Sequence, residues 1–255
     1  MRLSTLTTGT GPKRTVLVHG LLGSGRSLSG LARAWSARDP SRTFLLPDLA
    51  GHGSSGPLPP GVTLRDLARD VRETCGDAPF DLVGHSLGGR VALALLGDSP
   101  RTVRTLTLLD IAPGPLGPEV GESATVLDLL AAAPATVPDR ESMRRYLGQG
   151  GLDARLVEWL LTNLKPSAAD YVWRVDAKAL REAAPRTNAE DLWPVVEAHD
   201  KPIRCIRGGR SPYVGAADVR RLERAGCPVA TIDDAGHFLH VDALGRLVEL
   251  LAGAP

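Results

Sequence analysis

The sequence has little of what marks disulfide-bonded or membrane-spanning proteins. Its three cysteines, an odd number without C-x-x-C spacing, argue against a disulfide framework or a thiolate metal site and predict free thiols at Cys75, Cys205 and Cys227. No run of 18 apolar residues could span a bilayer, and the first residues lack the apolar segment of a signal peptide. We therefore expect a cytoplasmic protein without a membrane span.

A strong charge of one sign is also absent. The 30 Lys and Arg residues nearly balance 29 Asp and Glu residues, which leaves a formal net charge of +1. This balance argues against nucleic acid or an anionic membrane surface as a partner. Aromatic residues make up only 4% of the chain, but 43% of it is hydrophobic, which is enough for the core of an enzyme-sized domain.

The stretch from residue 80 to residue 96 has the pattern of a strand, a sharp turn and a helix. Residues 80–83 are apolar, residues 89–96 are rich in Ala and Leu, and Gly84-His85-Ser86-Leu87-Gly88 joins them. A G-x-S-x-G sequence in this context is typical of a nucleophile elbow, where glycines permit a strained turn that exposes the serine hydroxyl. In the alternative, Ser86 only caps the following helix. We favour the elbow because a strand and a helix flank it.

Short apolar runs elsewhere predict further strands, separated by patterns of helical spacing. We expect strands at residues 15–18, 43–46, 80–83, 105–109, 203–206 and 229–232. We expect helices near residues 28–37, 64–71, 89–96 and 244–251. Strands that alternate with helices in this way predict an α/β fold with a mostly parallel, doubly wound sheet, whose active site lies at the carboxyl ends of the strands.

The alternation stops between residues 113 and 200, where helical patterns occur near residues 124–133, 141–147 and 153–164. A long helical insertion between two strands usually covers the site. We therefore expect a helical lid, or cap, at 113–200, over an α/β core formed by 1–112 and 201–255. Trp159 and Trp173 in the lid, with Phe238, are candidate residues of the substrate pocket, although most lid aromatics are expected to pack only against one another.

The loop at residues 19–25 follows the first buried strand and precedes a helix, so its backbone N–H groups can point into the site. We assign the N–H groups of Leu21 and Leu87 to an oxyanion hole. The alternative for this loop is a glycine-rich connection without a chemical role.

Asp110 ends one predicted strand and His237 follows the last one, so Ser86, Asp110 and His237 have the chain order of a Ser-Asp-His triad. Serine is a weak nucleophile and needs a base within hydrogen-bond reach, and a third group must fix the tautomer of that base. His237 is the best candidate for the base. His52, between two glycines in a turn, has the setting of a structural histidine. A metal site that pairs His237 with His240 lacks further ligands, so we expect no metal and no cofactor.

Over its whole length the chain resembles the α/β-hydrolases, and more narrowly the bacterial YbfF-type esterases. The shared motifs are Val18-His19-Gly20, Asp48-x-x-Gly51-His52-Gly53, Gly84-His85-Ser86-Leu87-Gly88-Gly89, Leu109-Asp110-Ile111-Ala112-Pro113, Gly208-Gly209-x-Ser211-Pro212-Tyr213-Val214 and Ala235-Gly236-His237-Phe238-Leu239-His240. In most of the superfamily the acid follows the strand that ends here at Gly208, where this chain has Ser211. The resemblance implies that the acid has moved to Asp110 and that Ser211 supports the Asp110–His237 pair.

The resulting hypothesis is a serine hydrolase that cleaves carboxylic esters or acyl thioesters of small to medium acyl groups through an acyl-enzyme. Its expected partner is a small-molecule substrate, and the chain is expected to be a monomer or a small homo-oligomer. Two alternatives remain open. One is a cofactor-free perhydrolase or C–C bond hydrolase with the same triad, and the other is a ligand-binding protein that has kept the fold without turnover.

Overall fold

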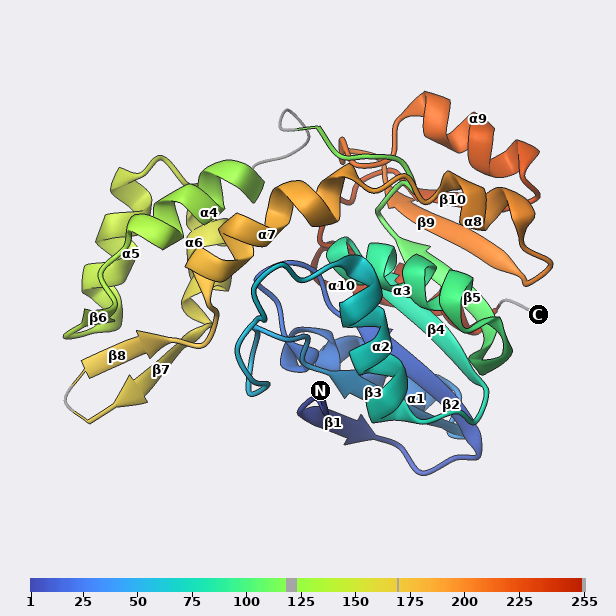
Figure 1. Ribbon diagram of the computed structural model, residues 1–255, viewed down its shortest axis with the longest axis horizontal. Coiled ribbons are helices and arrows are strands. Elements are labelled where there is room, and N and C mark those ends of the chain that lie inside the picture. The colour runs from blue at the N-terminus through green and yellow to red at the C-terminus, as the bar shows by residue number, and fades with distance from the viewer. Residues whose placement is uncertain (118–122, 169, 254–255) are drawn as a thin grey trace.

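The computed structural model describes residues 1–117, 123–168 and 170–253, in which a central sheet lies between two layers of helices and a further region extends from one end (Figure 1). The sheet has seven strands in the order β1-β3-β2-β4-β5-β9-β10, and every neighbouring pair is parallel except β1 and β3. The strands are β1 (Thr5–Thr8), β2 (Lys13–Val18), β3 (Arg42–Pro47), β4 (Phe80–His85), β5 (Val103–Leu109), β9 (Ile203–Gly208) and β10 (Val229–Ile232). Each strand expected from the sequence is present.

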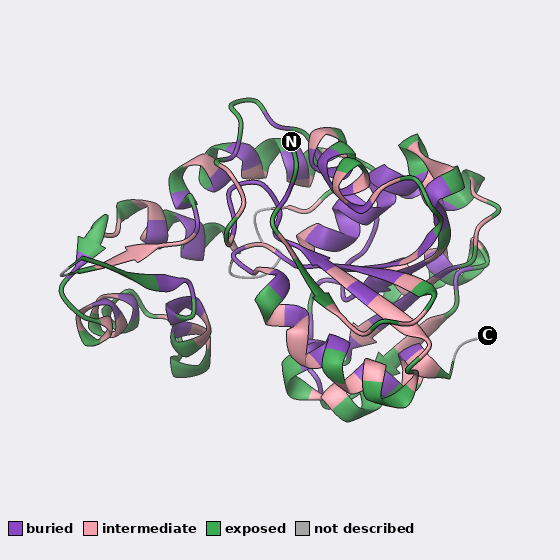
Figure 2. Ribbon diagram, turned by 90° about the horizontal axis from the view of Figure 1, so that it is seen from below, coloured by how far each residue is buried: buried purple, intermediate pink, exposed green. Residues whose placement is uncertain are grey.

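Helices cover both faces of the sheet. One face packs against α1 (Ser29–Arg38) and α11 (Leu244–Ala252), and the other against α2 (Leu64–Cys75), α3 (Leu87–Asp98) and α9 (Ala216–Arg224). Along β2, Val16 and Val18 point to the second face and Leu17 to the first. The carboxyl-terminal halves of the central strands, such as residues 16–18 of β2 and residues 108–109 of β5, are apolar without alternation because both faces are buried there, as the purple segments in Figure 2 show. Helix α9 was not predicted from the sequence, because Leu222 is its only buried residue and it therefore has too few apolar residues to mark a helical period.

The strand order changes direction between β2 and β4. From β2 the chain passes outward to β3, and then it returns to the other side of β2 to form β4. In doubly wound sheets, a crevice opens at such a switch point, outside the carboxyl ends of the two strands. The loop at 19–25 and the turn at Ser86 follow these two strands, so the topology brings them to one place.

The chain between β5 and β9 forms helices and a second, smaller sheet. The helices are α4 (Ser123–Ala132), α5 (Arg140–Gln149), α6 (Ala154–Leu161), α7 (Ala177–Ala189) and α8 (Trp193–Ala198). The antiparallel strands, in the order β6-β8-β7, are β6 (Thr136–Val137), β7 (Leu164–Ser167) and β8 (Asp170–Trp173). These strands were not expected from the sequence because they are too short for an alternating pattern. Helix α7 was not expected because it contains Pro185, and proline is unfavourable inside a helix. Short helical turns complete the fold at Gly25–Leu28, Pro100–Thr102 and α10 (Leu239–Asp242).

The division of the chain into a core and a lid stays a prediction, and residues 118–122 and 169 of the predicted lid lie outside the described residues. In Figure 1, α4, α5, α6 and the small sheet lie to one side of the central sheet, and α7 leads back to it. We call residues 113–192, the part of the chain that lies before α8, the insertion.

The two ends of the insertion are fastened to one side chain of α3. Arg90 is fully buried, and its guanidinium donates hydrogen bonds to the carbonyl oxygens of Gly114, Thr187, Asn188 and Glu190. Backbone hydrogen bonds also join the two ends to each other. Burial lowers the pKa of Arg90 to about 10, so the side chain stays a cation at neutral pH. Helix α3 therefore holds both the beginning and the end of the insertion.

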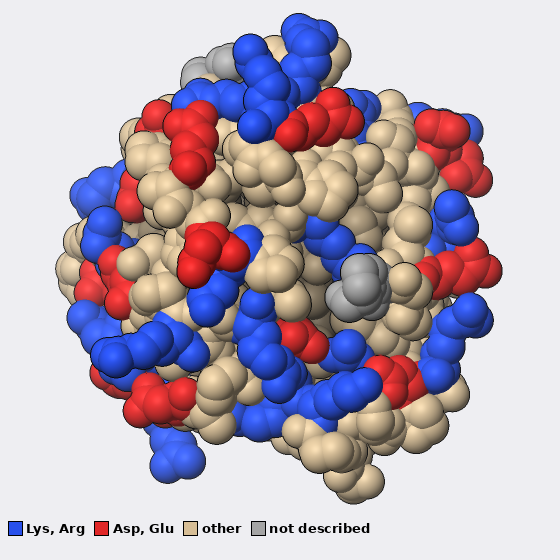
Figure 3. All heavy atoms as spheres, turned by 90° about the vertical axis from the view of Figure 1, so that its right-hand side faces the viewer, with Lys and Arg blue, Asp and Glu red and all other residues tan. Residues whose placement is uncertain are grey.

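The end of the molecule on the right of Figure 1 carries basic and acidic side chains interspersed, without a large patch of one sign on that face (Figure 3). Such a surface follows from the balanced composition of the chain. Within the described residues, no helix is both long and apolar enough to cross a membrane.

Candidate active site

Ser86 lies in the turn from β4 to α3 with φ 53° and ψ −121°, a conformation that non-glycine residues rarely adopt. Its N–H donates to the carbonyl of Leu109 at 3.1 Å, and its carbonyl accepts from the N–H groups of Gly89 and Arg90. Backbone strain of this kind persists where the surrounding structure enforces it, and it is concentrated at functional sites.

The glycines on either side of Ser86 are required by close packing. A Cβ at Gly84 would lie 2.3 Å from the carbonyl oxygen of Gly88, and one at Gly88 would lie 2.3 Å from the carbonyl oxygen of Val18. No side chain fits at these distances. The G-x-S-x-G pattern therefore has the steric basis that the sequence predicted for an elbow.

Asp110 and His237 form a hydrogen-bonded pair beside this turn. The Asp110 carboxylate is completely buried and accepts hydrogen bonds from His237 Nδ1 at 2.7 Å, from the Gly208 N–H at 2.8 Å and from the Ser211 hydroxyl. The His237 ring also stacks on Tyr213, with the ring centroids 3.9 Å apart. The structure thus brings together Asp110, His237 and Ser211, three residues that the sequence placed in the site. Tyr213 stands in a motif shared with the YbfF-type esterases, but nothing in the sequence indicates that its ring stacks on His237, so it was not predicted as a site residue.

The loop at residues 19–25 packs directly against the elbow. A Cβ at Gly20 would lie 3.1 Å from Ser86 Cβ, so the loop and the serine are in contact. Among the described residues, the N–H groups of Leu21 and Leu87, the predicted oxyanion donors, have no hydrogen-bond acceptor. Free backbone amides beside a nucleophile are used in oxyanion holes, and that role stays a prediction for Leu21 and Leu87.

Two buried histidines support this loop. His19 Nε2 accepts from the Leu49 N–H at 3.0 Å, and His52 Nε2 accepts from the Leu22 N–H at 3.2 Å. Burial lowers the pKa of His19 to about 4 and that of His52 to about 3, so both rings are neutral at physiological pH. His52 is thus a structural group, as its setting in the sequence indicates.

Two more histidines surround His237. His85 Nε2 lies 2.8 Å from the carbonyl oxygen of His237, and the ring centroids of His85 and His240 are 5.0 Å apart. Burial lowers the pKa of His85 well below its usual value and that of His240 to about 4. In the part of the chain that the structure describes, no group of three or more His, Cys, Asp or Glu side chains is arranged to hold a metal ion.

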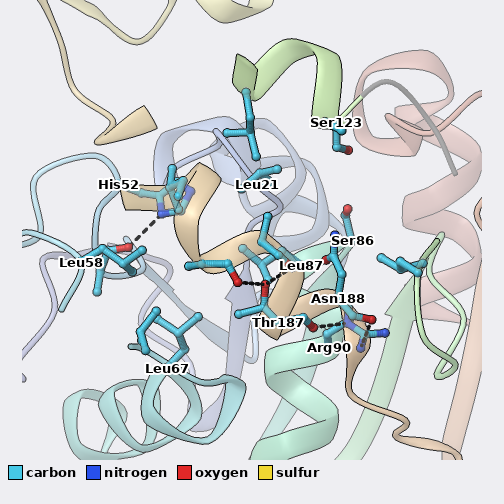
Figure 4. Close-up of a pocket in the computed structure, with 18 of the residues that line it drawn as sticks. Leu21, His52, Leu58, Leu67, Ser86, Leu87, Arg90, Ser123, Thr187 and Asn188 are labelled. Carbon is cyan, nitrogen blue, oxygen red and sulfur yellow. Dashed lines mark hydrogen bonds between the residues drawn. The ribbon is translucent and has the colours of Figure 1, made fainter. Parts of the chain in front are cut away.

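Two cavities meet at Ser86. The first, which we call the leucine cavity, has a volume of about 80 Å³ and is lined mainly by apolar side chains (Figure 4). Its leucines are Leu21, Leu58, Leu67, Leu87, Leu116, Leu127 and Leu180. The second, the histidine cavity, has a volume of about 290 Å³ and is lined by His19, His85, His237 and His240. Both cavities are lined by Leu21, Ser86, Ser123 and Tyr213, so Ser86 lies where the two cavities meet.

Two of the three predicted pocket residues line a cavity at Ser86, and the third does not. Trp159 and Phe238 line the histidine cavity, with ring centroids 5.0 Å apart, whereas Trp173 lines neither cavity. Leu58 and Val62 of the leucine cavity were not predicted from the sequence, because they lie in the proline-rich loop before α2, where no helical or strand period marks them.

Comparisons with known proteins show the family to which the chain belongs. A model of the alpha/beta hydrolase family matches residues 15–250. Esterase YbfF of Escherichia coli is 30% identical over 234 residues, which cover 89% of this chain and 87% of that protein. The sn-1-specific diacylglycerol lipase ABHD11 of Xenopus laevis is 28% identical over 237 residues, which cover 89% of this chain and 74% of the lipase.

Among solved structures, a marine microorganism esterase superposes with a TM-score of 0.88 at 21% identity and covers 99% of this chain and 98% of its own. At this low sequence identity, the structural similarity shows that the fold is shared and nothing more. Together the matches confirm the predicted fold class and the predicted family resemblance.

The buried histidines predict how stability depends on pH. The pKa of His52 is about 3 in the folded state against 6.5 when unfolded, so between these values the unfolded chain binds more protons. Its contribution to stability is complete above pH 6.5 and is lost as the pH falls toward 3. His52→Gln keeps an acceptor for the Leu22 N–H but removes this titration. We expect urea unfolding of this variant to depend less on pH between about pH 6 and pH 4, by about 1.4 kcal/mol per pH unit. An unchanged slope would mean that His52 is protonated in the folded state.

Proposed function

This chain belongs to the alpha/beta hydrolase family and is a hydrolase of the esterase and lipase class, and on that premise we propose that it cleaves small carboxylic esters or thioesters with Ser86 as the nucleophile. The observation that carries the proposal is the hydrogen bond between the buried Asp110 carboxylate and His237 Nδ1. The imidazole ring of His237 lines the same cavity as Ser86. A carboxylate in this position fixes the tautomer that leaves Nε2 free to accept a proton.

The reaction follows from these groups. Ser86 Oγ attacks the acyl carbon while His237 Nε2 takes its proton, and Asp110 stabilises the imidazolium that forms. The N–H groups of Leu21 and Leu87 stabilise the negative charge on the carbonyl oxygen. His237 then donates its proton to the leaving oxygen or sulfur. Water, activated by the same histidine, releases the acid from the acyl-enzyme.

Ser211 acts on Asp110 rather than on the substrate. Its hydroxyl donates to the same carboxylate oxygen, Oδ2, that accepts from His237, and its own oxygen accepts from the Tyr213 N–H at 3.3 Å. These bonds orient a carboxylate that is itself completely buried. Ser211 is therefore a positioning residue in this proposal.

The two cavities divide the substrate at Ser86. The leaving group must lie within reach of His237, which protonates it, and His237 lines the histidine cavity but not the leucine cavity. We therefore assign the alcohol or thiol part to the histidine cavity and the acyl part to the leucine cavity. The leucine cavity is the smaller of the two and is mostly apolar, which favours short to medium acyl chains.

The nucleophile is tested by Ser86→Ala. We expect kcat for p-nitrophenyl butyrate to fall about 10⁶-fold, because a triad acts as a unit, and labelling by a fluorophosphonate probe to disappear. Ser29→Ala is a matched control, since it removes an exposed hydroxyl that bonds only to the Arg26 carbonyl. Retention of a tenth of the activity in the Ser86 variant would contradict the assignment.

The acid is tested by comparing Asp110→Asn with Ser211→Ala. Asparagine favours the wrong tautomer of His237, so kcat should fall about 10⁴-fold, whereas loss of the supporting hydroxyl should cost about tenfold. Adding Ser211→Asp to Asp110→Asn restores a carboxylate beside the pair and should recover part of the loss. Near-normal steady-state activity in Asp110→Asn would show that another carboxylate orients His237.

The division of the substrate is tested with two ester series, one varied in the acyl chain and one in the alcohol. Ala184→Leu adds bulk to the leucine cavity and should reduce kcat/KM for hexanoate relative to acetate esters, by about tenfold or more. Trp159→Ala enlarges the histidine cavity and should change the preference among alcohols instead. If either variant changes selectivity mainly in the opposite series, the two halves of the substrate are wrongly placed.

A further inference from the structure

A strained residue in the loop at 19–25 is held from both sides by buried side chains. Leu22 has φ 60°, which places it in the left-handed region. Its N–H donates to His52 Nε2, and its carbonyl oxygen accepts a hydrogen bond from Asn163 Nδ2 at 2.7 Å. Both His52 and Asn163 are buried. A conformation of this kind persists only where neighbouring groups fix it, and these two bonds do so.

The two supporting side chains come from different parts of the chain. His52 follows β3, whereas Asn163 lies in the insertion between α6 and β7, 141 residues along the chain from Leu22. The backbone of Asn163 is itself fixed, because its N–H donates to the Leu160 carbonyl at 2.9 Å and its carbonyl accepts from the Arg174 N–H at 2.7 Å. The side-chain amide of Asn163 therefore moves with the insertion.

A second contact places the insertion beside the other support. The Asp176 N–H, just before α7, donates to the carbonyl oxygen of Gly51 at 3.1 Å, and Gly51 directly precedes His52. The insertion is thus bonded at one point to Leu22 and at another to the turn that carries His52. If the insertion moved away from the core, both of these hydrogen bonds would be broken.

Leu22 directly follows Leu21, whose N–H is the proposed oxyanion donor. The Leu21 N–H lies one peptide before the Leu22 N–H, so a change in the backbone dihedral angles of Leu22 shifts the Leu21 Cα and displaces this donor with it. Errors of about 1 Å in a catalytic group cost about 10²-fold in rate. We propose that Asn163 is a positioning residue through which the docked insertion holds the oxyanion loop in its active geometry. This inference rests on the proposed function, and it gives the insertion a part in the chemistry besides covering the cavities.

The test compares Asn163→Ala and Asn163→Asp with Thr162→Ala in the full-length protein. At pH 8 the aspartate has nearly the shape of asparagine but no hydrogen to donate. Thr162→Ala is a matched control, because it deletes a side-chain bond to the Trp159 carbonyl within the insertion. Active sites are counted with a fluorophosphonate probe, so that misfolded protein does not enter kcat. Hydrolysis of p-nitrophenyl butyrate and inhibition by butylboronic acid, whose tetrahedral adduct uses the oxyanion hole, are then measured.

We expect both Asn163 variants to lose about 10- to 100-fold in kcat per active site while KM changes less than about threefold. Boronic acid affinity should fall by a similar factor, and Thr162→Ala should match the wild type. A kcat within about twofold of wild type in either Asn163 variant, or a loss confined to KM, would overturn the inference. Failure of the wild type to react with the probe or to cleave the ester would instead overturn the proposed function on which it rests.

Discussion

The close packing where β4 turns into α3 is the constraint on which the rest of the site depends. Gly88 has no room for a side chain because the backbone of Val18, at the end of β2, lies directly against it. The same contact therefore places the serine and the loop that follows β2. Helix α3 begins at this turn, so Arg90, one helical turn later, is placed as well and reaches the insertion. One steric requirement thus orders the nucleophile, the oxyanion loop and the attachment of the insertion.

Charges in this interior are compensated in three different ways. Asp110 keeps its carboxylate buried by accepting three hydrogen bonds, and Arg90 keeps its guanidinium buried by donating to backbone carbonyls. The buried histidines near the site avoid the free-energy cost of burying a charge because they stay neutral. In consequence, no neighbouring imidazolium opposes the positive charge that the proposed mechanism forms on His237. The Asp110 carboxylate is left as the group that offsets it.

The strands, the elbow and the pairing of Asp110 with His237 could be anticipated because they depend on local patterns. Apolar runs mark buried strands, and groups at the ends of parallel strands must share one edge of the sheet. The supports of the loop could not be anticipated in this way. Asn163 has no motif, and its contact joins segments far apart in sequence. Similarly, nothing in the sequence around Arg90 indicates that its acceptors are carbonyls at both ends of the insertion, because that depends on tertiary packing.

The attachment of both ends of the insertion to Arg90 makes it, for the core, a single long loop on the connection between the neighbouring strands β5 and β9. The entropy of closing such a loop rises only slowly with its length. Insertions of quite different size and sequence are therefore compatible with the same core, provided that their ends reach the guanidinium and that a donor in the place of Asn163 still reaches the Leu22 carbonyl. Selectivity for substrates can diverge during evolution in one part of the chain while the chemical groups stay in place in the other.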